Sequence, residues 1–591
     1  MSDERQLFWS PRLVCERRAD GTVIMEQADP LPDHPQVLAA YLDRWAGAAP
    51  DRTWIARRGP DGGWTRISYA AARAKARALG AALLDLGLGP DRPLLILSEN
   101  SLEHALLGLA AIYVGVPYAP LATAYSLVSQ DHGRLKDIAA LLRPGAVFAD
   151  DGAAYAPALA AIAADGRAVI NRRNPVEGAL PFETLQRTDP VGADAARRGL
   201  TGDTVAKYLF TSGSTGSPKA VINTNAMICA SQAMVRDCYR FVTHQPPVVL
   251  DWAPWNHTAA GNKVSYLVLT NGGTYYIDDG RPAPGKFDET LRNLREIPCT
   301  WYFNVPVGYD MLVEAMKHDE DLARTFFSRL RMAFYAGAAM SQTTWNRLSA
   351  LGRKVTGRDV LLATGLGATE TAPFALACTR MQDRPGNVGV PSRGLSLKLV
   401  PNDGKLEARL RGPSITPGYY GDAEKTAEMF DEEGYYRLGD ALRPADPEDF
   451  SRGFFFDGRL AENFKLSTGT WVSVGAVRAR LVDAMDGLIR DAVIVGEDQA
   501  ELGALLWLSD RAQAMDPAAR DGALRDRLAA FARASTGSAS RVGRAIPLQE
   551  APSLDRGEAT EKGSLNQRAL RTRNADLIAA LYAGSGAAIV L

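Results

Sequence analysis

Short apolar runs that read as strands alternate with longer helix-like stretches over most of this chain. A buried strand is expected over residues 93–97, a helix over 104–114 and another strand over 146–149. Alternation of this kind predicts an α/β fold with layered and mostly parallel sheets. In such folds, ligands bind in the loops that follow the carboxyl ends of strands. Polar residues directly after apolar strands are therefore the first candidates for a functional site.

The chain of 591 residues is too long for a single hydrophobic core, so at least two domains are expected. We predict a large N-terminal domain of layered αβ subdomains over residues 1–457 and a small C-terminal α+β domain over 458–591. The large domain should contain a helix over 67–88 capped by Ser68, and strands over 248–252, 273–277, 299–304 and 332–335. The small domain should contain helices over 472–485 and 523–534 and strands over 491–495 and 504–508.

Charge and cysteine usage narrow the class of protein. The net charge of −1 gives no excess of positive charge that would attract nucleic acid or an anionic membrane. The five cysteines are scattered and form no CxxC pair, which argues against a disulfide framework and against a zinc site. The polar N-terminus lacks the apolar stretch of a signal peptide, and no run reaches the length of a spanning helix. We therefore expect a cytoplasmic enzyme without membrane insertion.

Residues 210–219 form a loop rich in glycine, serine and threonine between two strand-like segments, and the loop ends on Lys219. Backbone N–H groups, hydroxyl donors and one cation in such a run suit the wrapping of a polyphosphate. The sequence is not a Walker loop, which requires Gly-Lys-Ser/Thr at its end. Here Pro218 precedes the lysine and Ala220 follows it. A simple Gly/Ser turn is the weaker alternative.

Several further segments place polar residues after apolar strands. They are Asp-Trp-Ala-Pro-Trp-Asn-His-Thr at 251–258, Tyr-Ala-Gly-Ala-Ala-Met-Ser at 335–341, Gly-Leu-Gly-Ala-Thr-Glu-Thr at 365–371 and Tyr-Tyr-Arg-Leu-Gly-Asp at 435–440. Two segments that each set a cation beside a glycine follow at 458–465 and 561–566. Taken singly, each segment is equally well read as a buried histidine, a small-residue packing contact or a solvated turn. Their combination with the loop at 210–219 is the strong signal.

In this order and at these separations, the segments resemble the adenylate-forming superfamily of acyl- and aryl-CoA synthetases over about residues 41–568. Within that superfamily, the segments Asp-Trp-Ala-Pro-Trp-Asn-His at 251–257 and Lys-Gly-Ser-Leu-Asn-Gln-Arg-Ala at 562–569 look most like feruloyl-CoA synthetases. The resemblance implies ATP, Mg²⁺ and coenzyme A as reactants or cofactors. It also implies a small aromatic acid as substrate and a small domain that moves between two half-reactions. A homodimer is one oligomeric state that the resemblance leaves open.

The resemblance implies a role for each matching residue. The ATP-binding residues would be Thr211, Ser212, Gly213, Ser214, Thr215, Gly216, Lys219, Thr369, Asp440 and Arg459. Glu370 would be the magnesium-linked acid, Lys562 the lysine that reaches the α-phosphate and the carboxylate, and His257 the gate of the acid pocket. The acid pocket would be lined by Asn256, Gly337, Gly367, Pro373 and Phe374, and the hinge would lie at Ala461.

Some positions depart from the family pattern. Leu366 stands where an aromatic residue usually stacks on adenine, and Ala461 replaces the usual charged hinge residue. The glycines of the pocket leave a flat slot, which fits a hydroxycinnamate such as ferulate better than a long flexible acyl chain. A ligase for a benzoate-type or medium-chain acid, and an enzyme that loads a carrier-protein thiol, are the nearest alternatives. A regulatory nucleotide-binding protein without catalysis is the alternative from another class.

Overall fold

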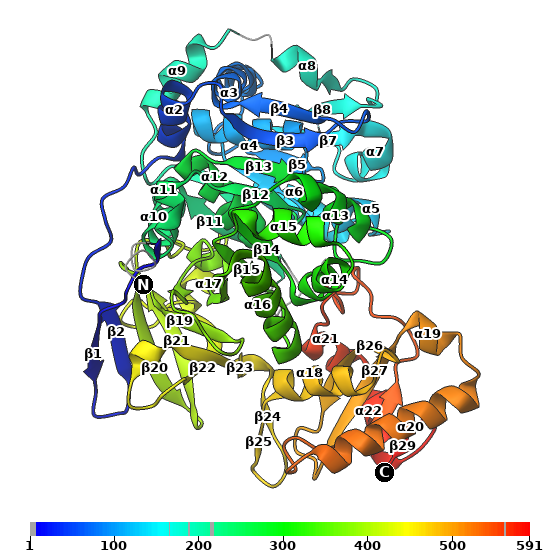
Figure 1. The fold of residues 1–591 in the computed structure, drawn as a ribbon. Coiled ribbons are helices and arrows are strands. Elements are labelled where there is room, and N and C mark those ends of the chain that lie inside the picture. Colours follow the sequence, from blue (N-terminus) through cyan, green and yellow to red (C-terminus); the bar gives the residue numbers. More distant parts are fainter. Residues whose placement is uncertain (1–6, 165, 187–188, 213–217, 561–562) are drawn as a thin grey trace.

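The computed structural model describes residues 7–164, 166–186, 189–212, 218–560 and 563–591. Figure 1 shows a large body from the N-terminal strands to β23 (Phe454–Arg459), and a smaller lobe that contains the C-terminus. In the described part of the chain, no helix has both the length and the apolar character needed to cross a membrane. All five cysteines are free, and four of them are buried.

A seven-stranded sheet carries the loop at 210–219. Its order is β11-β10-β6-β5-β7-β8-β9, and all neighbours are parallel except β10 and β11. The strands are β5 (Leu94–Leu97), β6 (Tyr118–Pro120), β7 (Ala146–Asp151), β8 (Ala168–Arg173), β9 (Leu180–Pro181), β10 (Val205–Ser212) and β11 (Pro218–Thr224). The apolar strand β5 is buried along its whole length, as a central parallel strand requires.

Two smaller sheets continue the α/β layers. One has the order β12-β13-β3-β4, with β3 (Thr53–Arg58), β4 (Trp64–Ser68), β12 (Val248–Asp251) and β13 (Thr274–Ile277). The other is fully parallel in the order β14-β15-β16, with β14 (Trp301–Asn304), β15 (Met332–Tyr335) and β16 (Leu361–Ala363). The ends of β12, β15 and β16 lead into the segments that the sequence singled out.

Helices cover these sheets and connect their strands. The main ones are α2 (Leu38–Ala48), α3 (Tyr69–Asp85), α4 (Leu102–Val114), α6 (Gly133–Leu142), α10 (Asn225–Cys238), α12 (Ser265–Asn271), α13 (Phe287–Glu296), α14 (Pro306–Met316), α15 (Glu320–Ser328) and α16 (Gln342–Thr356). The predicted cap is confirmed, because the Ser68 hydroxyl accepts the N–H of Ala71 at 3.3 Å. The helix predicted over 104–114 is confirmed as α4, which is buried almost throughout.

The expectation of mostly parallel sheets is wrong for one layer. A nine-stranded sheet in the order β1-β2-β20-β21-β22-β23-β19-β18-β17 is antiparallel throughout. Its long strands are β20 (Ser396–Asn402), β21 (Lys405–Arg411) and β22 (Tyr436–Pro444), and its short strands are β1 (Leu13–Arg17), β2 (Val23–Gln27), β17 (Gly365–Leu366), β18 (Leu376–Ala377) and β19 (Asn387–Pro391). Asp403 and Gly404 both have positive φ, which suits the two-residue turn that joins β20 to β21.

The C-terminal lobe has its own sheet and core. Its strands β26 (Ile489–Val495), β27 (Leu502–Leu508), β28 (Val542–Pro547) and β29 (Ile589–Val590) pair in that order, after a short hairpin of β24 (Phe464–Lys465) and β25 (Trp471–Val472). Helices α18 (Val474–Ala484), α20 (Pro517–Ala534), α21 (Gln567–Arg573) and α22 (Ala575–Ala583) accompany them. The buried apolar cluster of this lobe begins at Phe464, while β23 ends at Arg459. The boundary at 457/458 remains a prediction.

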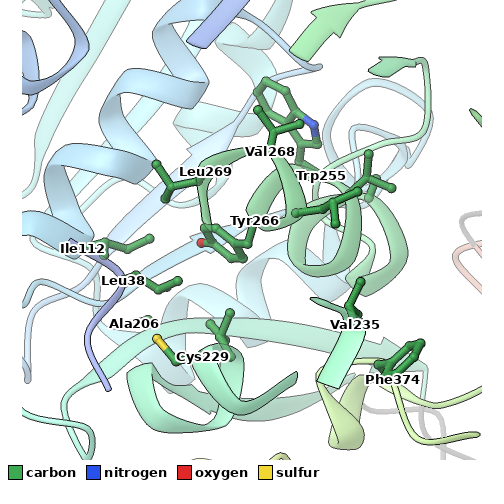
Figure 2. Close-up of a cluster of buried hydrophobic side chains, with 14 of the residues drawn as sticks. Leu38, Ile112, Ala206, Cys229, Val235, Trp255, Tyr266, Val268, Leu269 and Phe374 are labelled. Atoms are coloured by element: carbon green, nitrogen blue, oxygen red, sulfur yellow. The ribbon is translucent and has the colours of Figure 1, made fainter. Parts of the chain in front are cut away.

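The largest apolar cluster lies in the body and reaches the predicted acid pocket. Figure 2 shows side chains from α2, α4, β10, α10 and α12 packed together with Trp255, and Phe374 at the edge of the same group. Phe374 is 1% exposed. Residues of the candidate site are therefore set on a rigid core.

Candidate active site

The strands on both sides of the predicted phosphate loop form an antiparallel pair. Thr211 lies opposite Lys219, and Ser212 lies opposite Pro218. This register directs the strand ends towards a common loop. The loop residues Gly213, Ser214, Thr215 and Gly216 lie outside the described residues, as does Lys562.

Glu370 lies in a short 3-10 turn, Thr369–Thr371, which follows β17. Its side chain is buried, and the Tyr419 hydroxyl donates a hydrogen bond to its Oε1 at 2.9 Å. Lys219 Nζ lies 4.9 Å from the centroid of the same tyrosine ring. Tyr419 thus contacts both the predicted phosphate-binding lysine and the predicted magnesium-linked acid. Burial, together with the Glu370 carboxylate, raises the pKa of Tyr419, so its hydroxyl stays a donor.

Tyr419 is held in place by backbone pairing to β11. The N–H of Ile222 donates to the carbonyl of Gly418 at 3.1 Å, and the N–H of Tyr420 donates to the carbonyl of Ala220 at 2.9 Å. Sequence reasoning missed Tyr419. The signal available was the pair Tyr419–Tyr420 directly after a Pro-Gly turn, but only the tertiary pairing brings it to the loop.

Asp440 and Arg459 face each other across β22 and β23, as partners in the sheet register. Their atoms Oδ1 and Nε are 3.3 Å apart, but the geometry is not that of a hydrogen bond, and Oδ1 has no hydrogen-bond partner among the described residues. Burial raises the pKa of Asp440 to about 6; Glu462 and Glu370 add to this, and Arg459 opposes it. A buried carboxylate oxygen without a partner is suited to accept hydroxyl groups from a ligand.

His257 lies in the loop between β12 and α12, which several buried hydrogen bonds fix. The Trp255 indole N–H donates to the Tyr275 hydroxyl at 2.9 Å, and that hydroxyl donates to Asp251 Oδ2 at 3.0 Å. Burial raises the pKa of Asp251 to about 7. The N–H of Ala259 donates to His257 Nδ1 at 3.3 Å, so in the neutral ring the proton is on Nε2.

The residues predicted for the acid pocket come from three loops. Gly367 and Pro373 touch, because a Cβ at Gly367 would lie 1.6 Å from the Pro373 carbonyl oxygen. This close approach explains the glycine. Gly337, with φ of +87°, follows β15, and the space beside it is bounded by Val305. Asn256 is half-buried and has no hydrogen-bond partner in the described part of the chain.

The structure also describes the residues predicted for the hinge and for the adenine contact. Ala461 is exposed in a 3-10 turn, Leu460–Glu462, which connects β23 to the C-terminal lobe. Lys405 spans the same connection, since its Nζ donates to the Ser473 hydroxyl at 3.1 Å. Leu366 ends β17 and is 9% exposed, so an aliphatic side chain stands close to Glu370 in place of an aromatic one.

A six-residue π-helical segment, Ala259–Val264 and here called the π-turn, follows His257. Buried side chains donate hydrogen bonds to three backbone carbonyl groups of the π-turn. Lys207 Nζ donates to the carbonyl of Gly261 at 2.7 Å, and Gln232 Nε2 donates to the carbonyls of Asn262 at 3.0 Å and Lys263 at 3.2 Å. Sequence reasoning missed Lys207 and Lys263, whose signal was a lysine within an otherwise small and apolar stretch.

The carboxylate Glu370 is chemically suited to Mg²⁺, which prefers oxygen ligands. Among the residues that the structure describes, no group of three or more histidine, cysteine, aspartate and glutamate side chains could hold a metal by itself. A magnesium ion at Glu370 would therefore need oxygens from the nucleotide, as Mg²⁺ usually has in nucleotide sites.

Comparisons with known proteins identify the family of this chain. The model of the AMP-binding enzyme family matches residues 42–420, and that of the AMP-binding enzyme C-terminal domain matches 464–586. A carboxylic acid reductase of Mycobacterium marinum is 25% identical over 538 residues, covering 83% of this chain and 44% of the reductase. The chain thus spans less than half the length of that relative.

Two further similar proteins are matched over most of their own length. The 4-coumarate-CoA ligase 1 of Narcissus pseudonarcissus is 25% identical over 456 residues, covering 74% of this chain and 78% of the ligase. The crystal structure of ATP-bound MatB from Rhodopseudomonas palustris superposes with a TM-score of 0.68 at 22% identity, covering 91% of this chain and 99% of that chain. The family match extends over more than half of the sequence. The chain therefore belongs to the AMP-binding enzymes and has the two-part fold of adenylate-forming enzymes.

Proposed function

We propose that this chain is an AMP-forming acid–CoA ligase that activates a hydroxycinnamic acid such as ferulate. The observation that carries the proposal is the contact of one tyrosine, Tyr419, with both Lys219 and Glu370. A cation and a carboxylate that contact the same tyrosine beside a phosphate-type loop suit a nucleotide triphosphate with its metal. The buried Oδ1 of Asp440 has no hydrogen-bond partner among the described residues and would supply a matching acceptor for ribose hydroxyls.

In the first half-reaction, a carboxylate oxygen of the acid attacks the α-phosphorus of ATP, and the bond to pyrophosphate breaks. Lys219 would neutralise the leaving phosphates, and Glu370 would hold the magnesium ion that screens the remaining charge. Lys562, from the C-terminal lobe, would stabilise the pentavalent phosphorus. His257 would close the mouth of the acid pocket.

In the second half-reaction, the thiolate of coenzyme A attacks the acyl carbon of the adenylate, and AMP leaves. This step develops no comparable charge on phosphorus, so Lys562 could leave with its lobe. The 3-10 turn at Ala461 would be the site of that movement. Arg459 would stay beside Asp440 at the ribose.

The choice of acid is supported by the relatives and by the pocket. The matched 4-coumarate-CoA ligase acts, by its name, on a hydroxycinnamate. Pro373 and Phe374 follow Gly367 on one loop and would line the space for an aromatic ring. The match to 44% of a carboxylic acid reductase, a kind of enzyme that has been solved as an A-PCP didomain, supports a second candidate, an enzyme that passes its acyl group to a carrier-protein thiol.

The test is ATP–pyrophosphate exchange with ferulate, 4-coumarate, benzoate and octanoate, followed by AMP release with and without coenzyme A. We expect exchange with the hydroxycinnamates, thioester formation with free coenzyme A, and at least a hundredfold loss of exchange in Lys219→Ala. The matched control is Lys354→Ala, an exposed lysine on α16, which should behave as wild type. A preference for octanoate over ferulate would overturn the assignment of a hydroxycinnamate as the substrate. AMP release that does not depend on coenzyme A would overturn coenzyme A as the acyl acceptor. The absence of pyrophosphate exchange with every acid would overturn the whole proposal.

A further inference from the structure

Lys263 is a buried lysine for which the proposed half-reactions have no use. It lies on the π-turn, six residues after His257, and its side chain is 5% exposed. Within the described residues, its ammonium group has neither a hydrogen bond nor an ion pair, whereas nearby Lys207 donates two hydrogen bonds. A buried amine without a partner is costly, because it has lost water and gained nothing polar in exchange.

The surroundings of Lys263 are aromatic. Its Nζ lies 3.3 Å from the ring centroid of Phe334, 5.1 Å from that of Phe374 and 5.6 Å from that of Trp301. Cation–π contacts offset only part of the loss of hydration. Burial accordingly lowers the pKa of Lys263 well below its ordinary value, although the thiol of Cys238 acts in the opposite direction.

Two neighbouring polar atoms are also without partners. In the part of the chain that the structure describes, neither the indole N–H of Trp301 nor the hydroxyl of Tyr239 makes a hydrogen bond, and both residues are buried. The ring of Tyr239 lies 6.0 Å from that of Phe374. Native interiors rarely leave several polar groups of one cluster unsatisfied unless a water or a ligand completes them.

The backbone that carries Lys263 is rigidly positioned. Gln232 holds the carbonyls of Asn262 and Lys263, and Lys207 holds that of Gly261. Burial increases from Gly367, which is exposed, through Pro373, which is half-buried, to Phe374 at 1%. The loop therefore leads inward from Gly367 to Phe374, whose ring centroid lies 5.1 Å from Lys263 Nζ.

We propose that Lys263 determines specificity by hydrogen-bonding a phenolic oxygen at the far end of the acid's ring. The inference rests on the proposed function, since it concerns the substrate of that same site. Phe334, Phe374 and Trp301 would contact the ring, and the amine would bind the oxygen opposite the carboxylate-bearing chain. An unsubstituted or alkyl-ended acid leaves Lys263 buried and unpaired, so the site rejects it.

The first test needs no variant. It compares kcat/KM in ATP–pyrophosphate exchange for 4-hydroxycinnamate and 4-methylcinnamate, which differ by a hydroxyl in place of a methyl group of similar size. We expect roughly a ten- to hundredfold preference for the hydroxyl compound, the range expected when a buried donor is left without its hydrogen-bond partner. Equal values, or a preference for the methyl compound, overturn the inference.

The second test uses Lys263→Met, which keeps a long unbranched side chain without the amine. The variant should lose the preference, because 4-hydroxycinnamate loses the amine that binds its oxygen and 4-methylcinnamate no longer faces an unpaired amine. The exposed Lys354→Met serves as the control and should keep the preference. A Lys263→Met enzyme that still prefers the hydroxyl compound tenfold contradicts the inference; if the variant does not fold, the wild-type comparison decides.

The two proposals fail in different ways. Wild-type enzyme that exchanges pyrophosphate with no aryl acid overturns the proposed function and this inference with it. Wild-type enzyme that activates aryl acids without regard to a ring hydroxyl leaves the proposed function intact and overturns only the role of Lys263.

Discussion

At the scale of single residues, Tyr419 contacts both charged groups of the proposed nucleotide site. In Tyr419→Phe, Glu370 loses the hydroxyl that donates to it at 2.9 Å. We expect kcat/KM for ATP in pyrophosphate exchange to fall about tenfold or more, and the Mg²⁺ dependence to shift, because a hydrogen bond to a charged group is worth about 1.5–3 kcal/mol. The neighbouring Tyr420→Phe is the matched control: that tyrosine packs on Tyr208 and should tolerate the change. Similar losses in both variants would refute the role of Tyr419.

Asp440 links stability to pH at the same scale. Its pKa is about 6 in the folded chain against 3.8 for an ordinary aspartate, so the folded state binds more protons between these values. The contribution of the Asp440 carboxyl to the free energy of unfolding is therefore fully present below pH 3.8. It is lost as the pH rises through about 6, where the carboxyl of the folded chain becomes charged. One pKa unit corresponds to about 1.4 kcal/mol.

The prediction is that Asp440→Asn raises the melting temperature at pH 8, where the wild-type carboxylate is charged and buried, and raises it much less at pH 4, where the carboxyl is protonated in the folded chain. The same substitution should weaken adenosine binding at pH 8, since the amide accepts fewer ribose hydroxyls. Calorimetric melting and adenosine titration check the two halves; adenosine is used because it has no phosphate to titrate. A melting temperature of Asp440→Asn below that of wild type at pH 8 would contradict the inference that the buried Asp440 carboxylate destabilises the folded chain.

Predictability from sequence differs between these residues. Ser68 could be assigned because a helix cap is a local pattern, and this cap is confirmed. The ribose role of Asp440 stays a prediction, and Asp440 lies within β22, not after the end of a strand as the sequence suggested. Tyr419 and Lys263 could not be assigned, because their importance comes from contacts with segments far away along the chain: Tyr419 meets Glu370, and Lys263 meets Phe334 and Phe374. Nothing in the local sequence states which distant groups will surround a side chain.

At the scale of elements, the π-turn depends on close backbone approach. A Cβ at Gly261 would lie 2.1 Å from the carbonyl oxygen of Trp255, so Gly261→Ala must displace the turn. We expect a loss of at least about 2 kcal/mol of stability, measured as a lower melting temperature, because overpacking a buried site costs that much or more. Gly47→Ala is the control, since a Cβ at that position in α2 would meet nothing within 4 Å. It should be neutral or slightly stabilising.

Elements with a clear local pattern were predictable, and pairing between them was not. The strand expected over 332–335 is confirmed as β15, Met332–Tyr335, and the others agree within a few residues. The nine-stranded antiparallel sheet was not predicted because it pairs distant segments, as when β2 (Val23–Gln27) joins β20 (Ser396–Asn402). Alternation along the chain indicates that strands exist but leaves their partners open.

At the scale of the whole molecule, the body and the C-terminal lobe have separate apolar cores. A short chain segment links them, and Ala461 lies exposed in the middle of this segment. If the C-terminal lobe moves between the half-reactions, Ala461→Pro should slow thioester formation at least tenfold while pyrophosphate exchange changes little, because proline fixes φ at the hinge. Ala461→Gly, which frees the backbone at the same position, is the control and should support both steps. Equal slowing of both half-reactions by proline would argue against a hinge here.

The two-part architecture was predictable from length and from the change in segment size near residue 458. The structure confirms a distinct C-terminal core, and the family matches divide between residues 420 and 464. Finer assignments, such as the arrangement of the lobe relative to the nucleotide, depend on Lys562 and the loop glycines, which lie outside the described residues.

The tyrosine ring at position 419 also acts as a spacer. The Lys219 ammonium lies over its face and its hydroxyl donates to the Glu370 carboxylate, and within the described residues no ion pair joins these two charges. If ATP binds here as proposed, it would meet a cation and an anion that need not first leave a salt bridge with each other. Part of the reorganisation needed to receive ATP would then be completed during folding.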